Sequence, residues 1–463
     1  MNSTPHFISQ SESLVICDAD SRALTYLKHI ETRRVFPSPT AIAALDQFDR
    51  SLPDVGENPL DVIALMDEIG SPATVASNGP NYFGFVIGAS LPIAAAADRL
   101  ALAWDQCASS GVTSPIADKI ERVAARWLLD ILELPPDSAV GFGTSAAACT
   151  LTCLTTARRE LLRKKGWDFD RDGLDGAPRL RVVISNHAHV TMKKALRILG
   201  IGLGQIEYAP TDSQGVIDPT QLPWLDDATI FCLQAGEVNT GSFDPFDALI
   251  PRAKAAGAWT HVDGAFGLWA RAGSNRDLTK GIEGADSWTT DGHKWLNTPY
   301  DSAMAICRHA EAMSQAMSAD AVYASNQIGA QKNFNLEFSR RARGIPIWAA
   351  LCAMGREGVR QLIDRHCAQA QRAASELRKV GYQILNDVVL NQVLVRAGDD
   401  NTTLSIVEAA QKSGKAWFGQ TIWQDRPAFR LSFSSWRTED RHVDALINLL
   451  TQLYVAHEKP QSN

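Results

Sequence analysis

Short apolar runs alternate with longer amphipathic segments between about residues 179 and 290. The runs L-R-V-V-I-S, A-T-I-F-C-L and W-T-H-V have the length of buried strands, and segments of helical periodicity separate them. This alternation is typical of parallel strands joined by crossover helices. The chain is therefore predicted to be an α/β protein, with a mainly parallel central sheet and helices on both faces.

The pattern changes on both sides of this region. Residues 1–75 contain short helical segments broken by proline and glycine, such as Ala23–Thr32, and lack the apolar residues for a core of their own. We predict a helical arm that packs on another domain or on a partner subunit. A long helix near 356–379 is followed by alternating strands and helices, which predicts a small α+β domain at 356–463. Residues 76–355 then form the large α/β domain.

Three of the predicted strands run directly into polar residues. They lead to Ser185–His189, to Gln234–Glu237 and to Asp263–Ala265. Ligands of open α/β sheets bind outside the carboxyl ends of the strands, so we expect these ends to line one crevice. Their convergence is stronger evidence for a site than any single residue.

The third of these ends belongs to the stretch that points most directly to chemistry. Asp263 closes an apolar run, and Lys294 lies between His293 and Trp295, an unusual place for a lysine that only improves solubility. A lysine amine forms a Schiff base with an aldehyde, and a buried carboxylate keeps a pyridine nitrogen protonated. Together they are the protein half of pyridoxal 5′-phosphate (PLP) chemistry.

A phosphate-bearing cofactor also needs a cradle for its phosphate. The run G-F-G-T-S-A-A-A at 141–148 enters a turn of small residues that opens into a long helix. Backbone N–H groups and the positive end of the helix dipole bind anions at such a start. An ordinary helix start is the alternative, and the phosphate interpretation gains its weight from the lysine and the carboxylate.

Aromatic residues are crowded among glycines at 78–92, where they either wall a pocket or belong to a packed loop. A pocket with aromatic walls favours a hydrophobic or aromatic substrate. Gly79 and Gly88 stand where some proteins of similar sequence carry larger or polar residues, which predicts a pocket wider than in those proteins. The candidate wall residues are Tyr82, Phe83, Phe85 and Trp104.

Composition narrows the setting of this site. A chain of 463 residues is expected to split into about two or three domains, and its net charge of −7 favours neither nucleic acid nor an anionic membrane as partner. No signal peptide is recognisable, and no apolar run reaches the roughly 18 residues of a membrane span. The eight cysteines are scattered, which favours structural cysteines and a cytoplasmic protein. No spacing typical of metal ligands occurs, so no metal site is expected.

Several motifs together resemble group II PLP-dependent amino-acid decarboxylases, the family of the aromatic-L-amino-acid, glutamate and histidine decarboxylases. The matching runs are H-V-D-G-A, A-D-S-x-x-x-x-x-H-K-W-L, A-G-x-V-N-T-G-S-F-D-P, Y-F-G-F, L-E-L-P and R-R-A-R-G. The resemblance covers roughly residues 20–450. It implies a fold-type I PLP enzyme of the aspartate-aminotransferase-like kind, an amino-acid substrate, and a homodimer whose active sites are shared between subunits.

The resemblance also implies roles for individual residues. Lys294 would carry the cofactor covalently, Asp263 would bond its pyridinium nitrogen, and Ala265 would touch one face of the ring. His189 would stack on the other face, with His187 as the alternative. The other expected ligands are Ser145, Ala146, Ala147 and His293 for the phosphate, Asn239 and Thr240 in the same crevice, and, unless it forms a structural ion pair, Arg430 for the substrate carboxylate.

The sequence departs from this family at three places. Counting back from R-R-A-R, the tyrosine that protonates Cα in animal aromatic decarboxylases is replaced by Ala330-Gln331-Lys332, in a region expected to contain a mobile active-site loop. Tyr323 lies earlier and resembles a different family tyrosine. The phosphate turn reads S-A-A-A, and Asp291 stands where a neutral residue is more usual.

Three functions are compatible with these residues. The leading hypothesis is removal of the α-carboxylate of an L-amino acid, which gives an amine and CO2. The second keeps PLP but diverts the chemistry at Cα to oxidative aldehyde formation, C–C cleavage or transamination, because the loop tyrosine is missing. The third is a catalytically silent PLP-binding protein, and the intact Lys294, Asp263 and His189 argue against it.

Overall fold

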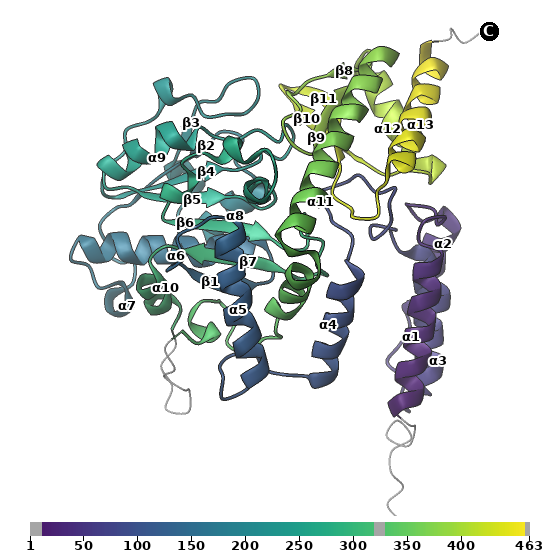
Figure 1. The fold of residues 1–463 in the computed structure, drawn as a ribbon, viewed down its shortest axis with the longest axis horizontal. Coiled ribbons are helices and arrows are strands. Elements are labelled where there is room, and N and C mark those ends of the chain that lie inside the picture. Colours follow the sequence, from purple (N-terminus) through teal and green to yellow (C-terminus); the bar gives the residue numbers. More distant parts are fainter. Residues whose placement is uncertain (1–11, 319–328, 459–463) are drawn as a thin grey trace, which may run out of the picture.

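The computed structural model describes residues 12–318 and 329–458 of the chain. A large α/β body lies beside a smaller unit of strands and helices, and the helices of the N-terminal arm stand at the outer side (Figure 1). Tyr323 and the first ten residues, on which two of the predictions fall, lie outside the described residues. Within the described ranges, no helix is both long and apolar enough to cross a membrane.

The large body is built on a seven-stranded sheet with the order β1-β7-β6-β5-β4-β2-β3. Only β7 runs antiparallel to its neighbours, so the prediction of a mainly parallel sheet is confirmed. The strands are β1 Ala139–Gly143, β2 Arg181–Ser185, β3 Ile206–Ala209, β4 Thr229–Gln234, β5 Trp259–Asp263, β6 Ser287–Asp291 and β7 Ala303–Cys307.

Helices cover both faces of this sheet, as predicted. Val182 and Ile184 of β2 pack toward α6 and α8, whereas Val183 between them packs toward α5, α9 and α11. This alternation follows from the two-residue period of a strand that is buried on both faces. The helices of the body are α4 Pro92–Trp104, α5 Pro115–Ile131, α6 Ala146–Lys164, α7 Phe169–Asp172, α8 Val190–Ile198, α9 Phe246–Ala255, α10 Ala310–Met317 and α11 Gly344–Val380.

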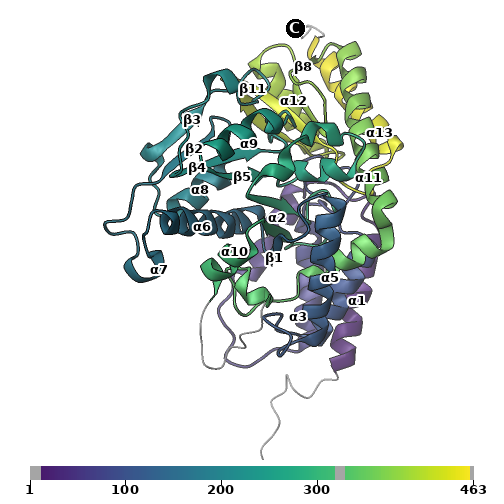
Figure 2. The same cartoon turned by 60° about the vertical axis from the view of Figure 1, so that its left-hand side comes forward.

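The smaller unit contains a four-stranded antiparallel sheet with the order β10-β11-β9-β8, and it lies at one end of the molecule in Figure 1 and Figure 2. Helix α11 joins it to the body and is interrupted at Gly355, beside the predicted domain boundary. Along α11, Cys367 still packs in the core of the body and Ala370 already packs in the core of the smaller unit. The elements are β8 Gln383–Ile384, β9 Gln392–Arg396, β10 Gly419–Trp423, β11 Arg426–Ser432, α12 Asp400–Ser413 and α13 Asp440–Glu458.

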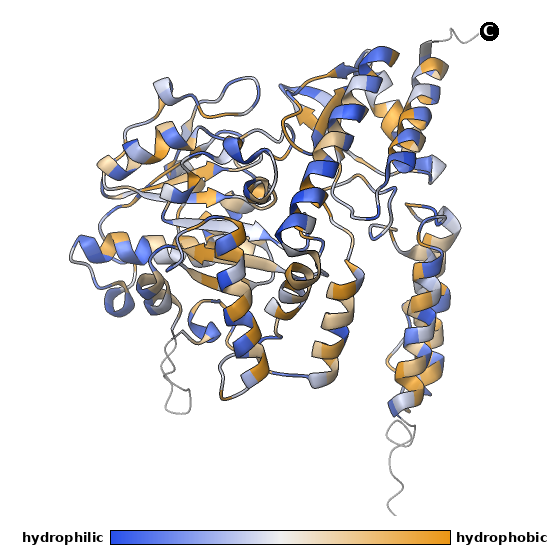
Figure 3. Cartoon of the chain, in the orientation of Figure 1, coloured by the Kyte–Doolittle hydropathy of each residue, from blue (hydrophilic) through white to orange (hydrophobic). Residues whose placement is uncertain are grey.

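The arm consists of α1 Glu12–Lys28, α2 Pro39–Ala44 and α3 Pro59–Leu65, and none of these helices buries a residue. Apolar and polar residues are mixed along α1 and α3 (Figure 3). Helix α1 begins well before the predicted start at Ala23. The arm is attached through the N–H of Val35, which donates to the Gly414 carbonyl at 2.8 Å.

Candidate active site

A cavity of about 310 Å³ lies at the carboxyl ends of the central strands. Residues that follow β2, β4 and β5 all line it, so the predicted convergence of three strand ends is confirmed. The start of α6, the turn after β6 and one arginine of the small sheet complete the lining. The lining residues are Phe85, Val86, Ser145, Ala146, Ala147, His189, Thr191, Gln234, Gly236, Val238, Asp263, Ala265, Phe266, Asp291, His293, Lys294 and Arg430.

Lys294 lies in the turn after β6, and this turn is tied to the small unit. The Asn297 side chain donates to the carbonyl of Ser434 at 2.9 Å, and its backbone N–H donates to the Lys294 carbonyl at 3.2 Å. Trp295 donates from Nε1 to Nδ1 of His366 at 2.9 Å. Burial lowers the pKa of His366 to about 3, so this ring is a neutral acceptor. The lysine therefore extends into the cavity from a rigid turn.

Gly79 and Gly88 do not line the cavity, so the predicted widening is wrong. A Cβ on Gly88 would lie 1.9 Å from the carbonyl oxygen of Lys294. Gly88 is required because the segment carrying Phe85 and Val86 passes directly over the backbone of the lysine turn. A Cβ on Gly79 would approach the carbonyl of Ala76 at 3.0 Å, away from the cavity.

Asp263 ends β5 with its side chain at the cavity, where 9% of the residue is exposed. Its Oδ1 accepts from the N–H of Ala265 at 3.2 Å, which fixes the carboxylate at the start of the following turn. Ala265 also lines the cavity. The roles expected of Asp263 at the ring nitrogen and of Ala265 at the ring face stay predictions.

His189 caps the start of α8. Its Nδ1 accepts from the backbone N–H of Thr191 at 3.4 Å and lies 2.7 Å from the Thr191 hydroxyl oxygen. A backbone N–H only donates, so Nδ1 is the acceptor and the proton of the neutral ring is on Nε2. Burial lowers the pKa of His189, which favours this neutral form. His187 instead packs on Trp423, with ring centroids 4.7 Å apart, and does not line the cavity.

The start of α6 faces the cavity with Ser145, Ala146 and Ala147. The Ser145 hydroxyl oxygen accepts from the N–H of Ala148 at 3.3 Å, which makes Ser145 the cap of the helix. The N–H of Ala146 donates to Oδ1 of Asp291 at 2.7 Å. The predicted turn of small residues is thus a helix start that already holds a carboxylate.

His293 lies beside this cradle and is 6% exposed. Its Nδ1 accepts from the backbone N–H of Ser302 at 3.2 Å, so the proton of the neutral ring is on Nε2. That nitrogen lies 3.8 Å from Oδ2 of Asp291. Burial lowers the pKa of His293, and the ring stacks on Tyr300 with centroids 4.2 Å apart. His293 thus lines the cavity near Asp291, and its contact with the phosphate stays a prediction.

Asn239 and Thr240 do not line the cavity, contrary to the prediction. Glu237 is 2% exposed, and its carboxylate accepts from the Asn239 side chain at 3.1 Å and from the Thr240 N–H at 2.7 Å. The Thr240 hydroxyl donates to the carbonyl of Gln214 at 2.8 Å. A buried carboxylate needs such donors, and it turns both side chains away. Val238, directly before them, lines the cavity instead.

Of the predicted aromatic wall, only Phe85 lines the cavity. Phe83 is 1% exposed and packs on Phe433 in the core of the small unit. Tyr82 stacks on Trp417 with centroids 4.9 Å apart. Trp104 ends α4 away from the cavity. Phe83 is wrongly predicted because its backbone pairs with the small sheet, which turns its ring into that core.

Arg430 of β11 lines the cavity, and its Nη1 donates to the carbonyl of Val238 at 2.7 Å. Within the described part of the chain it forms no salt bridge, so the alternative role in a structural ion pair is not supported. Burial lowers the pKa of Arg430, but a guanidinium stays charged. A substrate carboxylate would pair with this charge.

The segment at the expected tyrosine position is buried. Gln331 is 4% exposed and donates from its side chain to the carbonyl of Val140 at 3.0 Å. Arg340 forms a bidentate salt bridge with Glu121 of α5, and both side chains are fully buried. Ala330-Gln331-Lys332 is therefore a buried, hydrogen-bonded segment. Residues 319–328 of the expected loop region lie outside the described residues, so the mobile loop stays a prediction.

Sequence reasoning missed several lining residues. Thr191, Val238 and Phe266 each come one or two residues after one of the three predicted polar strand ends. This position is the only feature of the sequence that could have identified them. Within the described residues, Nε2 of Gln234 is buried without a hydrogen-bond partner and is available to a bound group. With Lys294, Asp263 and the start of α6, this lining fits PLP.

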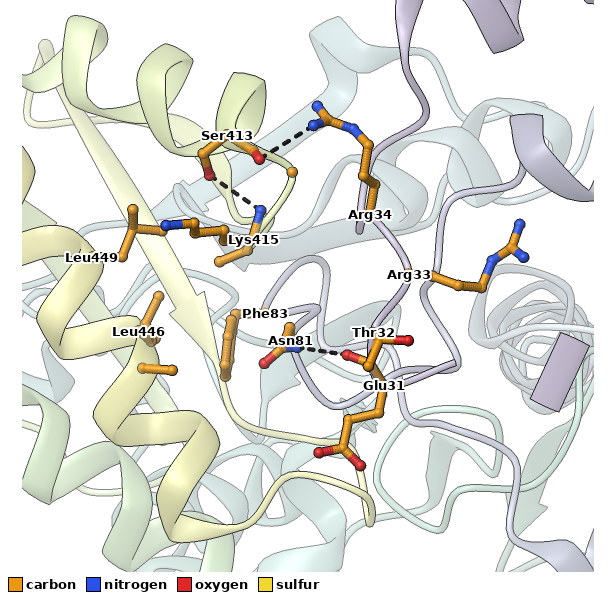
Figure 4. Close-up of a pocket in the computed structure, with 13 residues that line it drawn as sticks. Glu31, Thr32, Arg33, Arg34, Asn81, Phe83, Ser413, Lys415, Leu446 and Leu449 are labelled. Atoms are coloured by element: carbon orange, nitrogen blue, oxygen red, sulfur yellow. Dashed lines mark hydrogen bonds between the residues drawn. The ribbon is translucent and has the colours of Figure 1, made fainter. Parts of the chain in front are cut away.

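A second cavity, of about 370 Å³, lies between the arm and the small unit (Figure 4). Arg34 donates to the carbonyls of Ser413 at 3.3 Å and of Lys412 at 2.8 Å. Arg33 donates to the carbonyl of Ser71. Arg34 therefore joins the arm to the small unit at this cavity, whereas Arg33 bonds within the arm.

Comparison with known proteins finds one matching family and several related enzymes. Residues 41–397 match the family described as the pyridoxal-dependent decarboxylase conserved domain. Tryptophan decarboxylase 1 of Oryza sativa is 26% identical over 92% of this chain and 90% of its own length. Aromatic-L-amino-acid decarboxylase of Bacillus atrophaeus is 26% identical over 80% of each chain. Phenylacetaldehyde synthase of a rose cultivar is 24% identical over 79% of this chain and 78% of its own length.

Solved structures show the same fold. The crystal structure of Oryza sativa TDC with PLP and tryptamine superposes with a TM-score of 0.89 at 23% identity, covering 96% of this chain and 98% of that chain. The aspartate-aminotransferase-like, fold-type I architecture expected from the sequence is therefore confirmed.

Proposed function

The chain belongs to the pyridoxal-dependent decarboxylase family and is a PLP-dependent carboxy-lyase for an amino acid, and we propose that this substrate is an aromatic L-amino acid. The observation that carries the proposal is the apolar part of the cavity lining, made by Phe85, Val238 and Phe266. An aromatic ring buries a large apolar surface against such side chains. An acidic side chain would lose its hydration there without a partner.

Phe85 is held in an unusual way. It has a φ of 52° and Val86 has a φ of 58°, a region that side-chain-bearing residues seldom adopt. The Phe85 ring packs on Trp417 with centroids 5.1 Å apart, and 56% of the residue is exposed. This strained segment thus keeps an aromatic side chain available to a ligand, which supports an aromatic substrate.

The chain's own residues share the remaining work. When bound, PLP supplies an electron-withdrawing ring that stabilises the carbanion left at Cα after CO2 departs. Lys294 would hold the cofactor covalently, and Asp263 would keep its ring nitrogen protonated. Arg430 would bind the substrate carboxylate before the reaction. His189 would contribute a hydrogen bond from Nε2, and Thr191 would fix its orientation.

The test is a substrate screen of the purified protein with PLP, in which CO2, amine, aldehyde and hydrogen peroxide are all measured. Amine and CO2 are expected in equal amounts from phenylalanine, tyrosine or tryptophan. The kcat/KM for the best of these is expected to exceed that for glutamate by at least about 100-fold, because an unpaired buried charge costs several kcal/mol. Glutamate as the preferred substrate would contradict the proposal.

The second candidate is oxidative formation of an aldehyde. Among the described lining residues there is no tyrosine, so the usual donor of a proton to Cα is missing from that set. In the balanced reaction, amino acid, O2 and water give aldehyde, CO2, ammonia and hydrogen peroxide. Peroxide and aldehyde equal to CO2, without amine, would establish this reaction in place of simple decarboxylation.

We also propose that the protein is a homodimer in which the arm packs on the partner subunit and both chains contribute to each site. Support comes from the arm, whose three helices bury no residue within the chain. Its exposed apolar side chains need a cover. The most exposed large apolar residues of the arm include Leu14, Leu24, Leu52, Val55 and Met66.

We also propose a cytoplasmic location, which the eight unpaired cysteines support.

Sedimentation velocity at micromolar concentration is expected to give twice the mass of one chain. The double variant Leu24→Glu, Leu27→Glu is expected to weaken the dimer by at least about tenfold in dissociation constant, because it places two charges in the covered surface. Leu203→Glu, which adds a charge to an exposed leucine of the body, is the control. A wild-type monomer at these concentrations would contradict the proposal.

A further inference from the structure

Asp291 places a negative charge in the phosphate cradle itself. It is the last residue of β6, is 2% exposed and lines the cavity. Its Oδ1 accepts from the N–H of Ala146 at 2.7 Å, and its Oδ2 lies 3.2 Å from Nζ of Lys294. One carboxylate therefore holds a backbone donor of the helix start and the amine that binds the cofactor.

The backbone of Asp291 is fixed on both sides. Its N–H donates to the carbonyl of Ala265 at 2.8 Å, and its carbonyl accepts from Nε1 of Trp269 at 3.1 Å. Of the expected phosphate ligands at the helix start, the N–H of Ala146 is thus already engaged by this fixed carboxylate.

The neighbouring charges do not offset a further anion. The cationic groups that line the cavity are Lys294 and Arg430, and the carboxylates are Asp263 and Asp291. His189 and His293 both accept a backbone N–H at Nδ1, so each contributes a neutral ring. A phosphate dianion would therefore enter a lining whose formal charges sum to zero, and in which Lys294 is already paired with Asp291.

We propose that Asp291 is a resident anion of the cradle, which competes with the cofactor phosphate for the start of α6 and so weakens PLP binding selectively through the phosphate. This inference rests on PLP binding by the family and is independent of the substrate. Like charges within a few ångströms in a partly buried site repel strongly enough to change affinity by roughly tenfold to 100-fold, even after partial compensation by Lys294. The cofactor would then exchange more readily than in a site with a neutral residue at this position.

The test compares PLP with pyridoxal, which forms the same bond to Lys294 but lacks the phosphate. Both are titrated into the full chain after cofactor removal, and dissociation constants are measured by absorbance. Asp291→Asn is expected to bind PLP at least about tenfold more tightly, with a change of less than about threefold for pyridoxal. Asp291→Glu keeps the charge and is expected to keep the wild-type ratio of the two constants. Asp277→Asn, an exposed carboxylate, controls for net charge.

Two results would overturn the inference. An equal change for PLP and pyridoxal would show that Asp291 acts through Lys294 alone. Weaker PLP binding by Asp291→Asn would show that the carboxylate builds the cradle. Asp291→Ser is measured in parallel, so that a folding defect in one variant does not decide the outcome. No substrate is present, so failure here is distinguishable from failure of the proposed aromatic decarboxylation.

Discussion

Replacing Lys294 with alanine is expected to lower the rate of CO2 release by on the order of 10⁴-fold or more, because the residue that bonds to the cofactor is lost. The same change should abolish covalent trapping of PLP on borohydride reduction. Lys294 is the only lysine among the described lining residues. Mass spectrometry of the reduced, digested protein should find the cofactor on the peptide that contains it.

Lys194→Ala provides the control for this experiment. Lys194 is an exposed lysine of α8 outside the cavity, and its loss should leave labelling and CO2 release within about twofold of wild type. Labelling of another lysine in the wild-type protein would contradict the assignment. Full labelling of Lys294→Ala would contradict it equally.

Most of the fold could be predicted because the pattern along the chain reports burial directly. The strands β2, β4 and β5 read as continuous apolar runs since both of their faces are covered by helices. Helix α1 was placed too late because it buries no residue, and an unburied helix leaves little apolar periodicity to read. The pattern of apolar residues indicates burial within the chain, and it does not indicate burial of α1 against the proposed partner chain.

The site could be predicted where the backbone path alone brings residues together. His189, Asp263 and Lys294 lie at or just after the carboxyl ends of β2, β5 and β6, and the sheet brings these ends to one cavity. Prediction failed where the local pattern does not show which groups a side chain contacts. Phe83 packs in the core of the small unit, and Asn239 is turned away by Glu237, whose burial the sequence does not reveal.

The segment Ala330-Gln331-Lys332, at the expected tyrosine position, illustrates the same limit. Its weak sequence pattern indicates neither a helix nor a strand, which favours a loop. Gln331 is nevertheless buried, because it bonds to β1 and lies beside a salt bridge whose acid comes from α5. No local pattern reveals such a partner, since Glu121 and Arg340 are separated by more than two hundred residues.

Replacing Glu121 with alanine is expected to lower the free energy of unfolding by about 3–5 kcal/mol, because the fully buried guanidinium of Arg340 would lose its counter-charge. The loss includes the N–H of Gly344, which donates to the same carboxylate at 3.0 Å at the start of α11. Urea-induced unfolding, followed by tryptophan fluorescence, measures the change. Asp118→Ala, one turn earlier on α5, is the control, because its partner Arg122 is partly exposed and a pair of this kind contributes about 0–1 kcal/mol.

The double variant Glu121→Leu, Arg340→Met separates loss of charge balance from loss of packing. It removes both buried charges and fills most of their volume with apolar groups, so its stability is expected to lie within about 2 kcal/mol of wild type. If Glu121→Ala and the double variant were equally unstable, packing would be the dominant contribution of this pair. If Glu121→Ala were as stable as wild type, the charges would be solvated, which contradicts their complete burial between α5 and the segment after Gln331.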